Sequence, residues 1–198
     1  MSSLVLASAS RIRALLLERA GLAVVCDPAG LDEAEIKAAF RRDGSDAAGC
    51  AMALAEAKAS RVAPRHPGAL VIGADQLLVC GEAWLDKPSD LAEARRQLCS
   101  LRGRRHELVT AVALRRDDAL LWRRIERPVL VMRDFSDAFL DAYLASAGPG
   151  ALASAGAYQL EATGVQLFAR VEGDYFTILG LPLLPLLDCL RGLGALAA

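Results

Sequence analysis

Apolar and polar positions alternate along the chain in patterns that predict both strands and helices. Short apolar runs at residues 4–7, 21–26, 70–79 and 84–85 predict buried strands. Helical spacing predicts helices from the serines at 8–10 to near Gly21, and over residues 46–63, 91–101, 135–147 and 182–191. Alternation at residues 106–114 and 119–132 predicts a strand pair with a turn at 117–118, and residues 165–171 predict a further strand. The chain shows no internal repeat and no linker between independent domains.

The apolar run at residues 70–79 contains a carboxylate, Asp75, followed by an amide, Gln76. An ionised carboxylate inside a buried strand costs several kcal/mol unless it is paired or binds a metal. Gly73 leaves space for another backbone or a ligand to approach this strand closely. The strand therefore predicts a functional site at Asp75. The alternative is that Asp75 caps a turn between two short strands.

Ser8 and Ser10 lie between the first strand and the first helix, and Arg13 follows within that helix. Free N–H groups at a helix start, the positive end of its dipole, two hydroxyls and an arginine together favour anion binding. The segment has no glycines, so it is neither a Walker A loop nor a dinucleotide-binding fingerprint. The alternative is that Ser10 is only an N-cap, which contributes about 1 kcal/mol.

Composition limits the class of protein and of partner. The 198 residues suit one domain or two small lobes, and a net charge of −1 with 24% charged residues argues against binding long nucleic acid through bulk charge. Five cysteines without a C-x-x-C pair predict reduced thiols, and two histidines make a structural zinc site unexpected. No targeting segment stands out, and the apolar stretch 177–187 contains two prolines and is too short to span a bilayer. We expect a cytoplasmic protein without a membrane partner.

Lysine is rare in this chain, which has 20 arginines but only Lys37, Lys58 and Lys87. Lys58 shares a helix face with Leu54, which predicts either a position at a cleft edge or snorkelling past the core. Lys87 precedes Pro88, which stiffens its loop. Glu33 lies amid surface-like charge, and its local pattern is typical of a solvated carboxylate. Lysines, an arginine and carboxylates are the groups that phosphate chemistry requires.

Eight segments stand out along nearly the whole chain: LASASRIRALLL (6–17), LDE (31–33), LAEAKA (54–59), VIGADQ (71–76), DKP (86–88), LRGRRHELVTAV (101–112), SAGAYQLE (154–161) and EGDYFTILGLPL (172–183). In this order they resemble the motifs of the Maf family of nucleoside triphosphate pyrophosphatases. The resemblance implies one domain over residues 1–198 with an α/β fold. That fold is an elongated, mixed, twisted sheet flanked by helices, with two lobes around a central cleft.

The resemblance also implies a reaction and a set of site residues. The reaction is metal-dependent hydrolysis of a nucleoside triphosphate to a monophosphate and pyrophosphate, which removes modified or noncanonical nucleotides. Asp75, Glu33, Lys58 and Lys87 match the family's catalytic positions, Ser8, Ser10 and Arg13 match its phosphate-binding junction, and Glu33 and Asp75 are the expected ligands of Mg²⁺ or Mn²⁺. This assignment replaces the local interpretations of Glu33 and Lys58 as surface residues.

The preferred base stays open. Gln76 and Glu161 resemble the branch that acts on 7-methyl-GTP, whereas Ile12 matches neither branch and Arg11 stands where the family usually has proline. Gln76, Glu161 and Ile12 are therefore the candidate base-contacting residues. A homodimer is also expected from the family. Two alternatives are a nucleotide-binding regulator of cell division and septum formation without essential catalysis, and a phosphohydrolase that releases orthophosphate.

Overall fold

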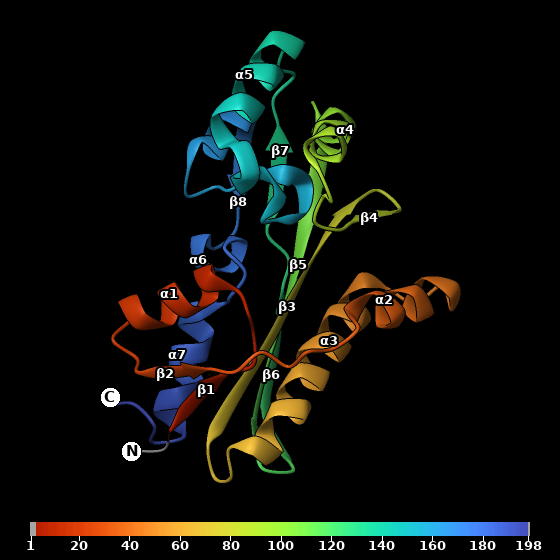
Figure 1. Cartoon of the computed structure of the whole chain (residues 1–198). Coiled ribbons are helices and arrows are strands. Elements are labelled where there is room, and N and C mark those ends of the chain that lie inside the picture. Colours follow the sequence, from red (N-terminus) through yellow and green to blue (C-terminus); the bar gives the residue numbers. More distant parts are fainter. Residues whose placement is uncertain (1–2, 198) are drawn as a thin grey trace. The chain divides into compact units, whose positions relative to one another are not determined.

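The structure is a computed structural model that describes residues 3–197, and within them an eight-stranded mixed sheet carries the fold (Figure 1). The strands are β1 (Leu4–Leu6), β2 (Val24–Cys26), β3 (Leu70–Cys80), β4 (Ala83–Leu85), β5 (Arg105–Arg116), β6 (Ala119–Glu126), β7 (Val129–Met132) and β8 (Phe168–Glu172). Their order is β2-β1-β3-β5-β7-β8, with β4 paired to β3 and β6 to β5. The β1 pairs with β2 and β3 are parallel, whereas β4, β6, β7 and β8 pair antiparallel. The prediction of a mixed α/β fold is confirmed.

Helices begin where the sequence supplies side-chain caps. The α-helices are α1 (Arg11–Arg19), α2 (Glu33–Arg42), α3 (Ala47–Val62), α4 (Leu91–Leu101), α5 (Asp137–Ala147), α6 (Tyr175–Ile178) and α7 (Leu183–Gly192). Short 3-10 turns are η1 (Ala63–Arg65), η2 (Gly148–Leu152), η3 (Ala155–Ala157) and η4 (Thr163–Leu167). Five helices start at a Ser or Asp whose side chain accepts a backbone N–H of the first turn: Ser10, Asp32, Asp46, Asp90 and Ser136. None of the helices within residues 3–197 combines the length and apolar character that a membrane span needs.

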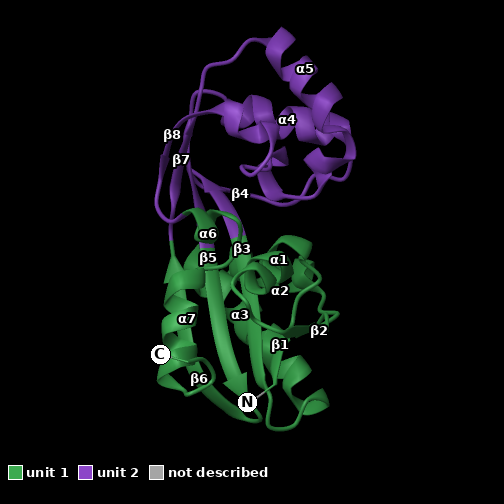
Figure 2. Ribbon diagram, turned by 90° about the vertical axis from the view of Figure 1, so that its left-hand side faces the viewer, with its two compact units in different colours: residues 1–76, 110–126, 175–198 green, residues 77–109, 127–174 purple. Residues whose placement is uncertain are grey.

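The chain divides into two compact units (Figure 2). Within the described range, unit 1 runs to Gln76 and adds Thr110–Glu126 and the chain from Tyr175, while unit 2 comprises Leu77–Val109 and Arg127–Asp174. Strands β3 and β5 contribute to both units, because each division falls inside the strand. The expectation of one domain over residues 1–198 stays a prediction.

Unit 1 covers both faces of its sheet with helices. In Figure 1, α1, α6 and α7 lie on one side of β3, and α2 and α3 lie on the other. Successive side chains of a strand point to opposite faces, so Ile72 and Ala74 join the core beneath α1 and α7, whereas Val71 joins the core with Ala59 and Val62 of α3. This alternation assigns Gly73 and Asp75 to the α3 face and Gln76 to the opposite face.

Gly73 allows α3 to lie unusually close to β3. A Cβ at residue 73 would lie 2.0 Å from the carbonyl oxygen of Ala55 and 2.8 Å from the amide nitrogen of Ala59. The helix presents small, fully buried residues to the sheet, namely Ala51, Ala55 and Ala59. The expected close approach at Gly73 is therefore that of a helix backbone.

Unit 2 contains α4, α5, η2, η3 and η4, together with β4, β7, β8 and parts of β3 and β5. The rings of His106, Tyr158 and Phe168 form a cluster, with Tyr158 meeting Phe168 edge to face at 4.8 Å between ring centroids. His106 is buried, and its Nε2 lies 2.9 Å from the hydroxyl of Tyr158. A buried imidazole is thus held in a polar contact without a charged partner.

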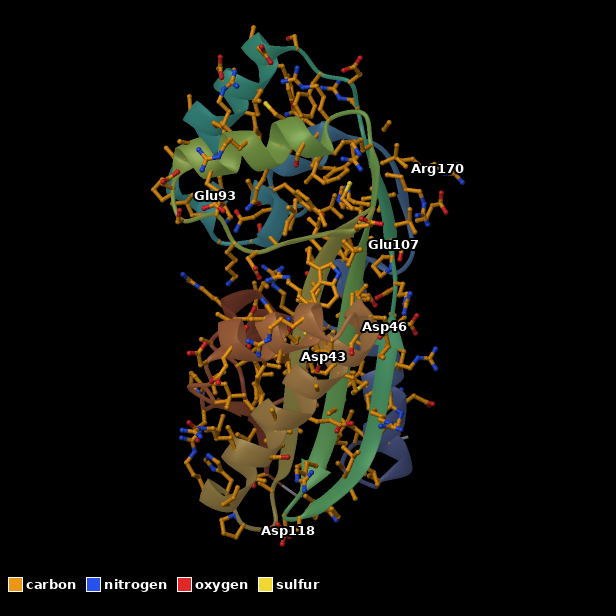
Figure 3. All side chains as sticks on the ribbon, turned by 90° about the vertical axis from the view of Figure 1, so that its right-hand side faces the viewer. Asp43, Asp46, Glu93, Glu107, Asp118 and Arg170 are labelled. Carbon is orange, nitrogen blue, oxygen red and sulfur yellow. The ribbon has the colours of Figure 1, made fainter. Side chains whose placement is uncertain are left out.

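Two strand predictions need correction. Residues 119–132 form two strands instead of one, because Arg127 and Pro128 separate β6 from β7 and proline has no N–H for a ladder. The strand expected at 165–171 begins at Phe168, since residues 163–167 form η4. The turn at 117–118 is confirmed, and Asp118 marks it in Figure 3. The five cysteines, all within residues 3–197, form no disulfide.

Candidate functional site

Three charged side chains meet on the α3 face of unit 1. The ammonium of Lys58 lies 2.6 Å from Oδ1 of Asp75 and 2.7 Å from Oε1 of Glu33. Lys58 and Asp75 have side chains only 8% and 6% exposed, whereas the side chain of Glu33 is 41% exposed. The structure thus brings together three of the four residues predicted to be catalytic.

Each of the three side chains is positioned by its own element. Asp75 lies near the middle of β3, on the same face as Gly73. Lys58 lies on the buried face of α3, four residues after the fully buried Leu54, as the helical spacing predicted. Glu33 is the first residue of α2, whose N-cap Asp32 accepts the backbone N–H of Glu35. The close packing of α3 at Gly73 brings the lysine within reach of the strand.

The ion pair with Lys58 acts on the pKa of Glu33. Partial burial raises the pKa of Glu33, but the hydrogen bond and charge of Lys58, with Lys37 and Arg13, hold that pKa below its ordinary value. Breaking a buried ion pair by removing one partner costs about 3–5 kcal/mol. The second carboxylate oxygen of Asp75, Oδ2, is buried and has no hydrogen-bond partner among the described residues. That oxygen is an acceptor without a donor, which fits an additional ligand or cation.

The serine–arginine junction lies in the same unit. Ser10 is the N-cap of α1, and its side chain accepts the backbone N–H of Arg13. Arg13 is buried and donates from Nε to the carbonyl of Gly180 at 2.7 Å and from Nη1 to the carbonyl of Ala74 at 2.9 Å. Nη1 also lies 3.3 Å from the hydroxyl of Ser8. Burial lowers the pKa of Arg13, and the nearby charges of Asp75 and Glu33 oppose that shift. Phosphate binding at this junction stays a prediction.

Gln76 points away from the charged cluster, on the opposite face of β3. Its amide nitrogen lies 2.7 Å from the hydroxyl of Thr110, 3.0 Å from the carbonyl of Thr177 and 3.2 Å from that of Ile178. The two candidate residues that are adjacent in sequence, Asp75 and Gln76, therefore have different surroundings.

The profile of the family described as Maf-like protein matches residues 3–193. The chain belongs to the Maf-like family. A nucleoside triphosphate pyrophosphatase of Granulibacter bethesdensis is 52% identical over 188 residues, covering 95% of both chains. One from Rhodospirillum rubrum is 52% identical over 200 residues, covering 99% of both. A 7-methyl-GTP pyrophosphatase of Rhizobium meliloti is 50% identical over 195 residues, covering 98% of both.

The remaining candidate residues of this Maf-like chain are Ile12, half-buried in unit 1, and Lys87 and Glu161, both exposed in unit 2. Lys87 lies on the loop before α4, where Glu93 accepts the backbone N–H and the hydroxyl of Ser89. Burial, with a smaller contribution from the charge of Glu161, raises the pKa of the Tyr143 hydroxyl to about 12. Lys87 and Glu161 thus both belong to unit 2.

Sequence reasoning missed Gln97, a buried residue of α4. Its amide nitrogen donates to the carbonyl of Asp86 at 3.0 Å, and its oxygen accepts the backbone N–H of Gly156 at 3.0 Å. Gln97 thus joins the segment DKP to the segment SAGAYQLE inside unit 2. Only its position on the apolar face of a predicted helix distinguished it, and a polar residue there signals a buried hydrogen-bonding role.

Proposed function

We propose that this protein is a nucleoside triphosphate pyrophosphatase, which hydrolyses the bond between the α and β phosphates. The observation that supports this most directly is the buried Asp75, paired with Lys58 through one oxygen and unpartnered at the other. A carboxylate with one free acceptor oxygen can hold or deprotonate a water. The reaction class is supported by relatives about 50% identical over nearly the whole chain, which are named as a nucleoside triphosphate pyrophosphatase and a 7-methyl-GTP pyrophosphatase.

In the proposed reaction, Asp75 takes a proton from a water that attacks the α phosphorus. The new P–O bond forms as the bond to the bridging oxygen breaks, and the electron pair leaves with pyrophosphate. Lys58 neutralises charge that develops on the phosphate oxygens, because its ammonium is already buried beside the base. The hydroxyl of Ser8, and that of Ser10 once it turns from its cap, would donate to phosphate oxygens.

The residues at this position fit a divalent cation such as Mg²⁺ or Mn²⁺. Magnesium sites of phosphate-handling enzymes use one or two carboxylates together with substrate phosphates. Glu33 and Asp75 supply two carboxylates, and the unpartnered Oδ2 of Asp75 is available as a ligand. No group of three or more His, Cys, Asp or Glu side chains suited to a metal occurs within residues 3–197. A bound cation would polarise the phosphate oxygens, and it requires Lys58 to move from between the carboxylates.

A modified purine triphosphate such as 7-methyl-GTP is the substrate we would test first, because several similar relatives carry that name. Gln76, Ile12 and Glu161 stay candidate base-contacting residues. Lys87 stays a candidate phosphate ligand. The homodimer and the cytoplasmic location also stay predictions.

Product analysis tests the proposal. Purified protein with Mg²⁺ or Mn²⁺ is incubated with the canonical triphosphates, ITP, 5-methyl-UTP, pseudo-UTP and 7-methyl-GTP. Monophosphate and pyrophosphate in equal amounts are the expected products. Orthophosphate would instead support the alternative phosphohydrolase. Absence of turnover with tight nucleotide binding would support the regulator of cell division.

A further inference from the structure

The loop that carries Lys87 is bonded to helix α4 on both sides of that lysine. On one side, the side-chain nitrogen of Gln97 donates to the carbonyl of Asp86 at 3.0 Å. On the other side, the carboxylate of Glu93, labelled in Figure 3, accepts the backbone N–H of Ser89 at 2.8 Å and its hydroxyl at 2.7 Å. The backbone around Lys87 is therefore held at residues 86 and 89 by two side chains that are neighbours on one helix face.

Pro88 adds a third restraint between these two contacts. It is buried, and its ring limits the backbone dihedral angles both of itself and of the preceding residue, Lys87. The exposed side chain of Lys87 thus extends from a restrained backbone. Such a backbone suits a lysine that has to meet a phosphate group at a fixed place, because a well-oriented group loses less freedom in the reaction.

Gln97 is itself buried, and its neighbours allow only one orientation of its amide. Only 8% of the residue is exposed. The carbonyl of Asp86 can only accept, so it faces the amide nitrogen, and the backbone N–H of Gly156 can only donate, so it faces the amide oxygen at 3.0 Å. The nitrogen also lies 3.5 Å from Oε1 of Glu93, which links the two contacts of the loop. Both ends of the Gln97 side chain are therefore bonded to protein groups.

Gly156 gives Gln97 a closely packed point of attachment in unit 2. The φ of Gly156 is +78°, and a Cβ there would lie 2.5 Å from Cδ1 of Leu78 and 2.7 Å from Cε1 of Tyr158, so glycine suits this position. Gly156 is buried, and without Gln97 its N–H would lose its acceptor. Gln97 thus connects the Lys87 loop to a part of the unit that has little room to move.

We infer that Gln97 and Glu93 are positioning residues, which hold the backbone of the Lys87 loop so that its ammonium meets the phosphates of the substrate. In this role both residues act through the loop, at Asp86 and at Ser89. The inference rests on the proposed function and deepens it, because it makes the contribution of Lys87 depend on two side chains of α4.

A merely structural role for Gln97 predicts a different result. If Gln97 only stabilised unit 2, its loss would affect the reaction equally with and without Lys87. A positioning role instead predicts a loss of rate that disappears once Lys87 has been removed, because the loop then has no ammonium to position.

The test is a double-mutant cycle on pyrophosphate release from the triphosphate that wild type hydrolyses best. Gln97→Met keeps the length of the side chain without its amide, and it should lower kcat/KM by about tenfold. In the Lys87→Ala background the same substitution should change kcat/KM by less than about twofold. Glu93→Ala should show the same dependence on Lys87 with a smaller loss, since Gln97 still holds residue 86. Glu93→Ala also carries the test if Gln97→Met does not fold.

Hydrogen exchange of the backbone of residues 86–90, followed by mass spectrometry, tests the hold on the loop without turnover. These amides should exchange about fivefold faster or more in Gln97→Met, as expected for the loss of one hydrogen bond. Gln166→Met is the matched control, since Gln166 is exposed in unit 2 and the same substitution there should change neither kcat/KM nor loop exchange.

Three results would contradict these expectations. An equal loss of kcat/KM with and without Lys87, or an unchanged kcat/KM in Gln97→Met, would overturn the inference. Unchanged exchange of residues 86–90 in Gln97→Met would also overturn it. A wild-type protein that releases no pyrophosphate would instead overturn the proposed function.

Discussion

The buried titratable side chains of the two units differ in charge. In unit 1, Lys58 lies between Asp75 and Glu33 and forms an ion pair with each, and it holds the pKa of Glu33 below its ordinary value. In unit 2, His106 is also buried, beside the phenol of Tyr158, the ring of Phe168 and the backbone of Arg104. Burial lowers the pKa of His106 to about 4, so its imidazole is neutral at pH 7.

The difference separates groups that can take part in chemistry from groups that affect only stability. Desolvation favours the neutral form of a buried group, and only specific partners of opposite charge can reverse that preference. The partners in unit 1 come from three elements, α2, α3 and β3. A buried charge network that leaves one carboxylate oxygen unpartnered is a candidate active site, whereas a buried neutral imidazole bonded to tyrosine is a packing feature.

The largest expected effect is that of Asp75→Asn, which removes the proposed base from the charged network. We expect the rate of pyrophosphate release to fall about a thousandfold, within the range for loss of a general base. The asparagine keeps the shape of the side chain, so circular dichroism should be unchanged. Asp118→Asn, at the exposed turn between β5 and β6, is the control with wild-type rate (Figure 3). A wild-type rate for Asp75→Asn would remove Asp75 from the mechanism.

His106 should dominate the loss of stability at mildly acidic pH. The unfolded chain binds a proton at His106 near pH 6.5, whereas the folded chain does so only near pH 4. Between these values the unfolded state holds more protons, so the free energy of unfolding falls as pH decreases through this window. The expected loss from this residue is about 3 kcal/mol, measured by urea unfolding at successive pH values. In His106→Phe the decrease should be smaller, and an identical slope would contradict this assignment.

Lys87→Ala tests the prediction that Lys87 is a phosphate ligand. We expect kcat/KM for the triphosphate to fall by about a hundredfold, since a cation that neutralises phosphate charge stabilises the transition state. Stability should not change, because Lys87 is exposed on a loop. Lys87→Arg keeps the charge and should retain more activity. Loss of the folded circular-dichroism signal in Lys87→Ala would count against the assignment.

Lys58→Met tests the charged cluster of unit 1 through metal binding and not through turnover. In the nucleotide-free protein the ammonium of Lys58 competes with a cation for Glu33 and Asp75. Its removal should tighten Mn²⁺ binding by about tenfold or more, measured as loss of the free Mn²⁺ signal in electron paramagnetic resonance. Lys37→Met removes a lysine whose charge also acts on Glu33 but has a smaller effect on its pKa than Lys58 does, and should change Mn²⁺ affinity less. Weaker Mn²⁺ binding by Lys58→Met would show that the two carboxylates are not the ligands.

Local patterns predicted most elements and the conspicuous members of the site. Asp75 and Lys58 stood out because a charge in an apolar run or on an apolar helix face contradicts its surroundings. Glu33 did not, because its contact with Lys58 depends on how α2 packs against α3, which no local pattern encodes. The bonds from Gln76 to Thr177 and from Gln97 to Gly156 span long separations along the chain and were equally invisible.

The two strand boundaries that were predicted wrongly have local causes. Pro128 ended a strand whose alternation otherwise continued from residue 119 to 132, and the apolar Val165 and Leu167 suggested a strand where a 3-10 turn forms. A proline without an N–H ends a strand even where the alternation of apolar and polar residues continues.

The alanines of α3 have a consequence for how this site can vary. Ala55 and Ala59 set the spacing between helix and strand, and that spacing determines whether an ammonium on α3 can reach a carboxylate on β3. A larger residue at 55, 59 or 73 would retract Lys58 while leaving every charged group in place. Small uncharged residues therefore determine whether Lys58 reaches Asp75, and a screen that mutates only charged positions would overlook them.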